Sequence, residues 1–111
     1  MRTAVRFGVI VGFLLGTHLA LAQQGDAKAG SAVYNKSCAT CHGADGTAKE
    51  PIAKMLQVEI KHLGSKEVQA KSDADIRKVI TEGAGKMKPV KSLAEKDVAN
   101  VIAYVRTLAQ R

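Results

Sequence analysis

Three stretches of the chain repeat apolar residues at the spacing of an α-helix, with irregular stretches between them. The first covers residues 26–36, where Gly30, Val33 and Tyr34 fall on one face. Asp26 precedes this face and can accept hydrogen bonds from the first free amides of a helix. The pattern therefore predicts an amphipathic helix that ends close to Cys38.

The second stretch covers residues 73–82. Ser72, followed by Asp75, provides a helix start, and Gly83 provides a stop. The apolar stripe of this stretch consists of Ile76, Val79 and Ile80. A short amphipathic helix is predicted.

The third stretch has the strongest helix signals. Ser92 and Glu95 fit a capping box, and we predict a helix from this point to the C-terminus. Its apolar stripe consists of Val98, Val101, Ile102, Val105 and Leu108.

Residues 43–72 are less regular. Apolar side chains could form a helical turn or two there, namely Ile52, Met55, Leu56, Ile60 and Leu63. No stretch alternates apolar and polar residues between hairpin turns, so the predicted fold class is all-α.

The first residues have the layout of a signal peptide. Arg2 and Arg6 give a positive start, an apolar run follows, and residues 20–22 read Ala-Leu-Ala, a small-residue cleavage signature. We therefore assign residues 1–22 to a cleaved signal peptide and residues 23–111 to one exported or periplasmic domain. An uncleaved anchor is the alternative, but Thr17 and His18 interrupt the run before it reaches the about 20 apolar residues of a membrane span.

Cleavage would leave a small basic domain. It would have 89 residues, and the loss of Arg2 and Arg6 would lower the formal net charge from +7 to +5. Tyr34 and Tyr104 would be its only aromatic side chains. A domain of this size buries only about 60–65% of its unfolded surface, so its stability is marginal unless something else fills the core.

The two cysteines stand in Cys38-Ala39-Thr40-Cys41-His42, a C-x-x-C-H motif. This motif predicts that one haem c is attached covalently through Cys38 and Cys41, with His42 as an axial ligand of the iron. The spacing suits that chemistry because one helical turn brings both sulfurs near the vinyl groups of the porphyrin. The next imidazole then points beneath the ring.

Other uses of the cysteines have less support. A disulfide or a thioredoxin-like redox pair normally lies at a helix start after a strand, whereas Cys38 follows a predicted helix. A closed zinc site needs four ligands, and the chain has no second cysteine pair.

A haem electron carrier needs a sixth iron ligand, because a filled coordination sphere changes little between Fe(III) and Fe(II). Met87 is the preferred candidate, since its loop contains Gly83, Gly85 and Pro89 and is not a packed helix. Met55 lies in an apolar stripe and is interpreted as a core gap-filler. His62 is interpreted as an exposed or core-edge side chain, and the lysines are weaker candidates still.

Four features in order along the chain resemble the class I c-type cytochromes, the small monohaem cytochrome c family. They are Gly30 with Tyr34 before the C-x-x-C-H motif, Gly43-Ala44-Asp45-Gly46 after it, the Met87 loop, and a terminal helix containing Ala103-Tyr104-Val105-Arg106. The resemblance covers nearly all of the mature chain. It implies three main helices wrapped around one haem, with the N- and C-terminal helices crossing so that Gly30 and Tyr34 meet Val101 and Tyr104.

Two details of the resemblance stand out. Family members often have Met-Pro at the ligand loop, whereas Lys88 separates Met87 from Pro89 in this chain. They also place a proline carbonyl against the free nitrogen of the ligating imidazole, and Pro51 is the candidate for that role.

The resemblance implies a soluble, monomeric electron carrier that catalyses nothing by itself and exchanges single electrons with redox proteins. No stable membrane insertion is expected after signal cleavage. Lysines near the haem would attract partners with acidic docking surfaces, namely Lys86, Lys88 and Lys91 with Lys49 and Lys54. An ordinary solvated lysine surface is the alternative.

Other function classes are weighed against the carrier. Nucleic-acid binding is poorly supported, because the charge is modest and no series of aromatic residues accompanies it. A haem enzyme or gas sensor with an open iron position stays open, as does a disulfide oxidoreductase that uses Cys38 and Cys41 without haem.

Overall fold

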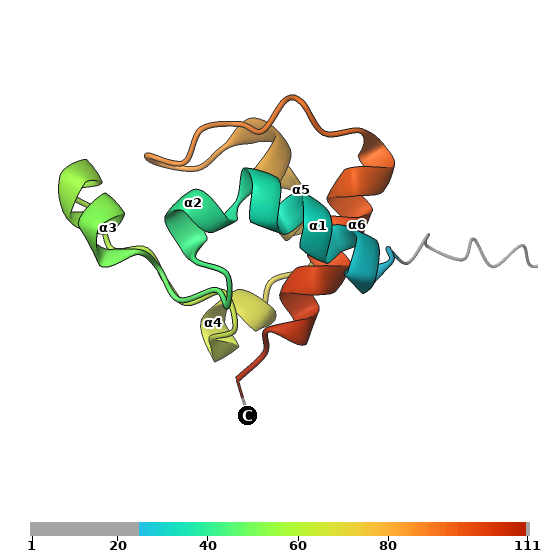
Figure 1. The fold of residues 1–111 in the computed structure, drawn as a ribbon, viewed down its shortest axis with the longest axis horizontal. Coiled ribbons are helices and arrows are strands. Elements are labelled where there is room, and N and C mark those ends of the chain that lie inside the picture. The colour runs from blue at the N-terminus through green and yellow to red at the C-terminus, as the bar shows by residue number, and fades with distance from the viewer. Residues whose placement is uncertain (1–24, 111) are drawn as a thin grey trace, which may run out of the picture.

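The computed structural model describes residues 25–110, so the assigned signal peptide and its cleavage site lie outside the described residues. Six helices follow in order (Figure 1): α1 (Ala27–Ser37), α2 (Ala39–His42), α3 (Glu50–Leu56), α4 (Lys66–Gln69), α5 (Asp73–Glu82) and α6 (Glu95–Thr107). Within residues 25–110 the only β-type pairing is an isolated bridge between Ala84 and Met87. The all-α prediction is confirmed, and the three longest helices are the three that the apolar pattern predicts.

Side-chain caps fix the starts of two helices as expected. Asp26 accepts hydrogen bonds from the amides of Lys28 and Ala29, at 2.8 and 3.2 Å, at the start of α1. Ser72 accepts one from the amide of Asp75 at 3.0 Å at the start of α5. Each cap satisfies amides that have no partner within the helix.

The predicted capping box of Ser92 and Glu95 is wrong. Helix α6 begins at Glu95, its N-cap is Ala94, and no side chain caps it. The amide of Val90 bonds the carbonyl of Ile80 at 2.8 Å, so the chain before α6 is still held to α5. The Glu95 carboxylate pairs with Arg77 of α5 and does not return to Ser92. The helix also ends at Thr107, before the C-terminus.

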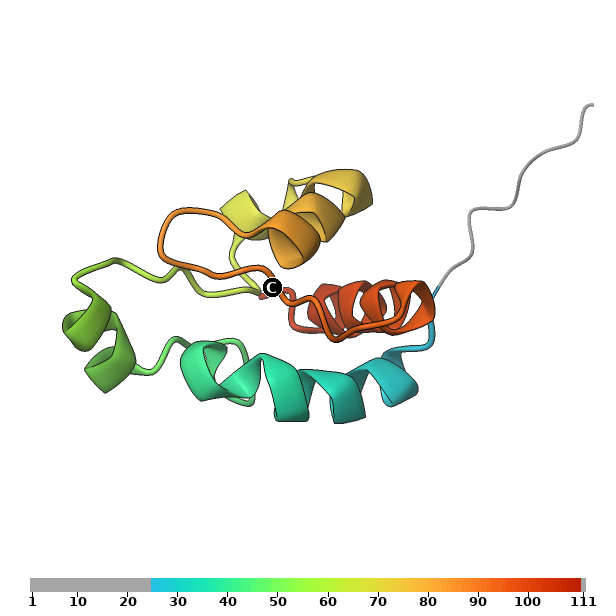
Figure 2. The ribbon, with the colours of Figure 1, turned by 90° about the horizontal axis from the view of Figure 1, so that it is seen from above.

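The core forms where α1 crosses α6, as both views of the ribbon show (Figures 1 and 2). A Cβ at Gly30 would collide with the backbone of Asn100, so glycine is what lets the two helices approach this closely. Tyr34 is fully buried, and its ring centroid lies 4.9 Å from that of Tyr104. The expected helix crossing is therefore present. The buried apolar side chains are Tyr34, Ile76, Ile80, Val98, Val101, Ile102 and Val105.

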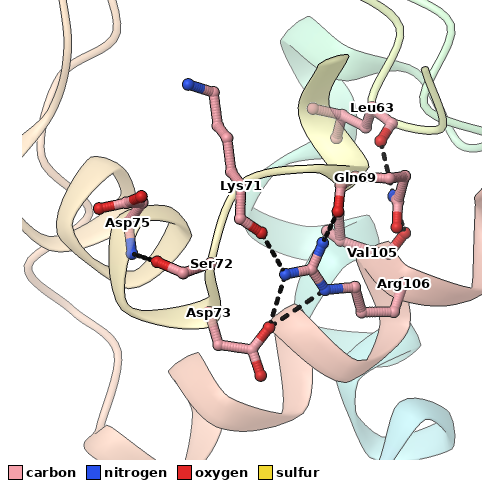
Figure 3. Close-up of polar contacts among 8 residues, drawn as sticks. All are labelled: Leu63, Gln69, Lys71, Ser72, Asp73, Asp75, Val105 and Arg106. Carbon is pink, nitrogen blue, oxygen red and sulfur yellow. Dashed lines mark hydrogen bonds and ion pairs between the residues drawn. The ribbon is translucent and has the colours of Figure 1, made fainter. Parts of the chain in front are cut away.

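Polar bonds tie the segment before α5 to α6 (Figure 3). Arg106 donates to the carbonyl oxygens of Gln69 and Lys71, at 2.8 and 2.6 Å, and to Asp73 Oδ1 at 2.7 and 3.1 Å. The side-chain amide of Gln69 donates to the carbonyls of Leu63 and Val105 at 2.9 and 3.0 Å. Of these acceptors, the Gln69 carbonyl is the one left free at the end of α4, and the others tie the segments around α4 to α6.

Helix α3 stands apart from the crossing, at the opposite end of the molecule from α6 (Figures 1 and 2). The closest helix contacts are those of α1 with α2, α1 with α6, and α5 with α6, none of which involves α3. No helix among residues 25–110 combines the length and apolar character that a membrane crossing requires.

Candidate functional site

The C-x-x-C-H motif continues the line of α1. Cys38 is both the C-cap of α1, with its amide bonded to the Tyr34 carbonyl at 2.8 Å, and the N-cap of α2. The amide of His42 bonds the Cys38 carbonyl at 3.0 Å, which closes one helical turn across the motif. Gly43 then ends α2 with φ of +70°, a conformation that glycine adopts freely. The motif therefore forms one turn of helix attached to the main crossing.

A single cavity of about 890 Å³ brings the predicted site residues together. Cys38, Cys41 and His42 line it from α2 and its N-cap, and Met87 lines it from the loop between α5 and α6. Much of the remaining wall is apolar and comes from α3, the segment after it and the end of the Met87 loop: Ile52, Met55, Leu56, Val58, Ile60, Pro89 and Val90. The sequence assigned none of these seven residues to the site. It placed the apolar residues of 52–60 against the core, and Val58 and Val90 gave no signal of their own.

The imidazole of His42 is partly buried at the wall of the cavity. Its Nδ1 is buried and has no hydrogen-bond partner, so Pro51 does not make the expected bond in this structure. Burial lowers the pKa of His42, which favours the neutral imidazole, the form that binds metals. The resemblance assigns the other ring nitrogen to the iron, so the unpartnered Nδ1 is a cost that no group among residues 25–110 offsets.

The two thiols do not resemble a redox-active pair. Cys38 and Cys41 are both partly buried, and they are not bonded to each other. Burial raises the pKa of Cys38, whereas a catalytic disulfide exchanger needs a lowered thiol pKa. Within residues 25–110, no three side chains of His, Cys, Asp or Glu are grouped as a protein-ligated metal site requires. The geometry therefore gives no support to the oxidoreductase or zinc alternatives.

Met87 is held at the end of a tight hairpin. Its carbonyl accepts from the amide of Ala84 at 3.0 Å, and its amide donates to the Ala84 carbonyl at 2.9 Å. Gly85 takes φ of +54° within this turn. The loop character that the sequence predicted is confirmed, and Met87 is partly buried against the cavity.

The interpretation of Met55 as a core gap-filler is wrong. Met55 is 70% exposed, and it lies on α3 at the edge of the cavity. The stripe that contains it faces the cavity and not the helix crossing. His62, by contrast, does not line the cavity; its Nδ1 accepts from the amide of Gly64 at 2.8 Å. His62 is thus a partly buried loop residue, close to the role expected for it.

Two tyrosine hydroxyls hold the segment that follows His42. Tyr34 donates to the carbonyl of Gly43 at 2.6 Å, and Tyr104 donates to the carbonyl of Ala44 at 3.1 Å. The sequence indicated these rings as packing partners and gave no signal for their hydroxyl groups. They connect the crossing of α1 and α6 to the residue next to the candidate iron ligand.

The residues of the cavity fit haem c. The volume lies within the range of about 300–1,000 Å³ that is usual for bound organic ligands. Two thiols and an imidazole lie along one side, a thioether is contributed by a separate loop, and much of the wall is apolar. These are the donor groups that attach and ligate haem in c-type proteins.

Comparison with known proteins gives the family. Residues 25–105 match the family model described as "Cytochrome C oxidase, cbb3-type, subunit III". The chain belongs to the c-type cytochrome family. It therefore carries covalently bound haem c, and its activity is haem-based electron transfer.

Individual relatives agree with this membership. The cytochrome is 33% identical to cytochrome c-554(547) of Halothiobacillus neapolitanus over 76% of this chain and 98% of the relative. Among solved structures it resembles the KustC0563 c-type cytochrome, with a TM-score of 0.64 and 31% identity over 73% of this chain and 98% of that one.

A second solved structure shares the fold alone. It is the Kuenenia stuttgartiensis reducing HAO-like protein complex Kustc0457/Kustc0458, with a TM-score of 0.62 and 23% identity. The match covers 76% of this cytochrome and 43% of that chain. The small cytochrome c fold predicted from the sequence is confirmed.

Proposed function

We propose that this cytochrome is a soluble carrier of single electrons, in which Cys38 and Cys41 hold the haem and His42 and Met87 are the axial ligands of its iron. The observation that carries the proposal is the cavity, which gathers all four side chains although Met87 belongs to a distant loop. Ligation by histidine and methionine raises the reduction potential, as an acceptor of electrons requires.

The chain has three tasks in this function: it holds the haem, ligates the iron and excludes water. Bound haem supplies the one-electron change between Fe(III) and Fe(II). The thioether bonds of Cys38 and Cys41 fix its position, and the neutral imidazole of His42 donates a lone pair. Apolar side chains such as Leu56 and Val90 exclude water, which also favours the less charged, reduced state.

Met87 is a better sixth ligand than Met55. Both methionines line the cavity, but Met87 is held by two backbone hydrogen bonds, whereas Met55 is largely exposed. A preorganised ligand loses less conformational freedom on binding.

Absorption spectra of the purified holoprotein, oxidised and reduced, with and without carbon monoxide, test this assignment. We expect a haem spectrum that carbon monoxide leaves unchanged in the natural protein and in Met55→Ala. Met87→Ala should lose the thioether–Fe(III) band and bind carbon monoxide. An unaltered spectrum in Met87→Ala would refute the ligand assignment, and ready carbon monoxide binding by the natural protein would favour a sensor or a haem enzyme.

A free carrier is favoured over a fixed subunit by the size of the relatives. This chain covers 98% of both cytochrome c-554(547) and the KustC0563 c-type cytochrome, so each is about the length of this one domain.

We propose that residues 1–22 direct export and are removed, so the purified protein should begin near Gln23. Size-exclusion chromatography should give a monomer that does not sediment with membranes.

Docking of acidic redox partners would use the lysines of the Met87 loop. Lys86, Lys88 and Lys91 all line the mouth of the cavity. Lys49 does not line it, and the charge of Lys54 is offset by Glu50 at 2.6 Å. The proposed docking patch therefore consists of Lys86, Lys88 and Lys91, and is smaller than the five-lysine patch that the sequence indicated.

Electron-transfer rates measured against ionic strength test this patch. With an acidic partner protein, the second-order rate should fall as salt rises, because salt screens exposed charges. Lys88→Gln should lower the rate at low salt, whereas Lys96→Gln, on the exposed side of α6, should not. Equal effects of the two variants would indicate an unspecific basic surface.

A further inference from the structure

The loop that presents Met87 contains a glycine whose position is sterically closed. Gly83 ends α5 with φ of +80° and ψ of 171°, a conformation that is essentially restricted to glycine. A Cβ at this position would lie 2.5 Å from the carbonyl oxygen of Met87 and 3.0 Å from Cδ of Pro89. Carbon and oxygen in ordinary contact are well over 3 Å apart, so a side chain here would force the Met87 backbone to move.

The other glycine of the loop has no such restriction. Gly85 also has a positive φ, of +54°, but a Cβ added there meets nothing within 4 Å. Gly83 and Gly85 thus differ in what a side chain at each position would meet. A side chain at residue 83 collides with the backbone of Met87, and a side chain at residue 85 points into open space.

Backbone bonds make the hairpin a defined unit. Ala84 and Met87 exchange two hydrogen bonds, at 3.0 and 2.9 Å, and the amide of Val90 bonds the carbonyl of Ile80 in α5 at 2.8 Å. Met87 can therefore shift only if this hairpin opens or pivots at its junction with α5. Gly83 is that junction, since it is the C-cap of α5.

We propose that Gly83 is a positioning residue: by letting the hairpin fold back against the end of α5, it fixes the place of the Met87 thioether and keeps the sixth position of the iron closed to other ligands. The inference rests on the proposed role of Met87 as the sixth ligand. It adds the part of the chain that sets the position of that ligand in the folded holoprotein.

A comparison of Gly83→Ala with Gly85→Ala tests the inference on holoprotein. Both substitutions place alanine at a positive φ, so both should lower the melting temperature. Only Gly83→Ala should lose the thioether–Fe(III) absorption band, shift the reduction potential downward and bind carbon monoxide. A Gly83→Ala protein with the band and potential of Gly85→Ala would overturn the inference.

Two further variants separate the possible failures. In a Met87→Ala background, adding Gly83→Ala should leave the reduction potential unchanged, because the residue through which Gly83 acts is gone; a further shift would contradict a positioning role. If Met87→Ala alone keeps the natural spectrum, the ligand assignment itself has failed. If the Gly83→Ala holoprotein does not accumulate, Ala84→Pro takes its place, because this substitution removes the amide that is bonded to the Met87 carbonyl. Ala84→Pro should weaken the thioether–Fe(III) band. An unchanged band in this variant would overturn the inference.

Discussion

At the scale of single residues, the Tyr34 hydroxyl connects the helix crossing to the haem motif. Its side chain is fully buried, and it donates to the carbonyl of Gly43, the residue next to His42. Burial raises the pKa of Tyr34, so the hydroxyl keeps its proton and remains a donor at all physiological pH values. The partner hydroxyl of Tyr104 makes a longer bond to the exposed carbonyl of Ala44.

Substitution of these two tyrosines should therefore have unequal effects. Tyr34→Phe keeps the ring but leaves a buried carbonyl without its best donor, and should lower the free energy of unfolding of the holoprotein by about 1 kcal/mol. Tyr104→Phe should cost clearly less, because water can replace the lost bond. Chemical denaturation of both holoproteins measures the two free energies of unfolding. Equal decreases would show that the buried hydrogen bond stabilises the protein no more than the exposed one.

Individual residues also show how far sequence can go. The resemblance to the cytochromes placed Gly30 and Tyr34 correctly at the helix crossing. The three motif residues line one cavity, as their local spacing indicated, and their roles toward haem stay a prediction. Met55 could not, because an apolar stripe on a helix does not reveal whether it faces protein atoms or a cavity.

At the scale of elements, Arg106 binds three separate groups with one planar side chain (Figure 3). It reaches the carbonyls of Gln69 and Lys71 and the carboxylate of Asp73, so it joins the C-terminal half of α6 to the junction of α4 and α5. A lysine keeps the charge but cannot make this divergent set of bonds.

Arg106→Lys should consequently destabilise the holoprotein by about 1.5–3 kcal/mol. The matched control is Arg77→Lys. Among the described residues the Arg77 side chain pairs with one group, the exposed carboxylate of Glu95, so that exchange should cost about 0–1 kcal/mol. Thermal melting of the two variants gives the comparison. A control as unstable as Arg106→Lys would show that the network is ordinary surface charge.

The capping signals in the sequence predicted the starts of α1 and α5 correctly and the start of α6 wrongly. Asp26 and Ser72 act as caps because each is extended and stands directly before its helix, with a side-chain oxygen bonded to an amide two or three residues on. Ser92 has the same local sequence signal, but its segment is bound to α5 through Val90, and Glu95 finds a partner in Arg77. Tertiary bonds of this kind cannot be inferred from a window of a few residues.

At the scale of the whole molecule, the cavity borders a core of seven buried apolar side chains. The three most extensive helix–helix contacts do not involve α3, and the apolar residues of α3 line the cavity assigned to haem. The sequence predicted that a further group is needed to fill the core. It did not predict that α3 encloses this group, because that role depends on how the chain folds back over a group that is not protein.

Protein without haem should accordingly be largely unfolded. The variant carrying both Cys38→Ala and Cys41→Ala, verified to contain no haem, should show weak helical circular dichroism and no cooperative melting, because a ligand that binds only the folded state supplies much of the stability. The natural holoprotein, melted under the same conditions, is the reference. Cooperative, native-like melting of the haem-free variant would contradict this expectation.

The crossing of α1 and α6 also constrains the order in which the molecule can assemble. The amide of Asp26 bonds the side chain of Asn100, a partner 74 positions away, and closing a flexible loop of that length costs about 4 kcal/mol of chain entropy. Tyr34 of α1 and Val98 and Val101 of α6, which are fully buried, also come from the two ends of this loop. A growing chain therefore cannot complete its core until α6 has emerged. Since the chain without haem is expected to be largely unfolded, Cys38 and Cys41 stay on an open segment until haem is attached, and attachment then precedes the closing of α6 onto α1.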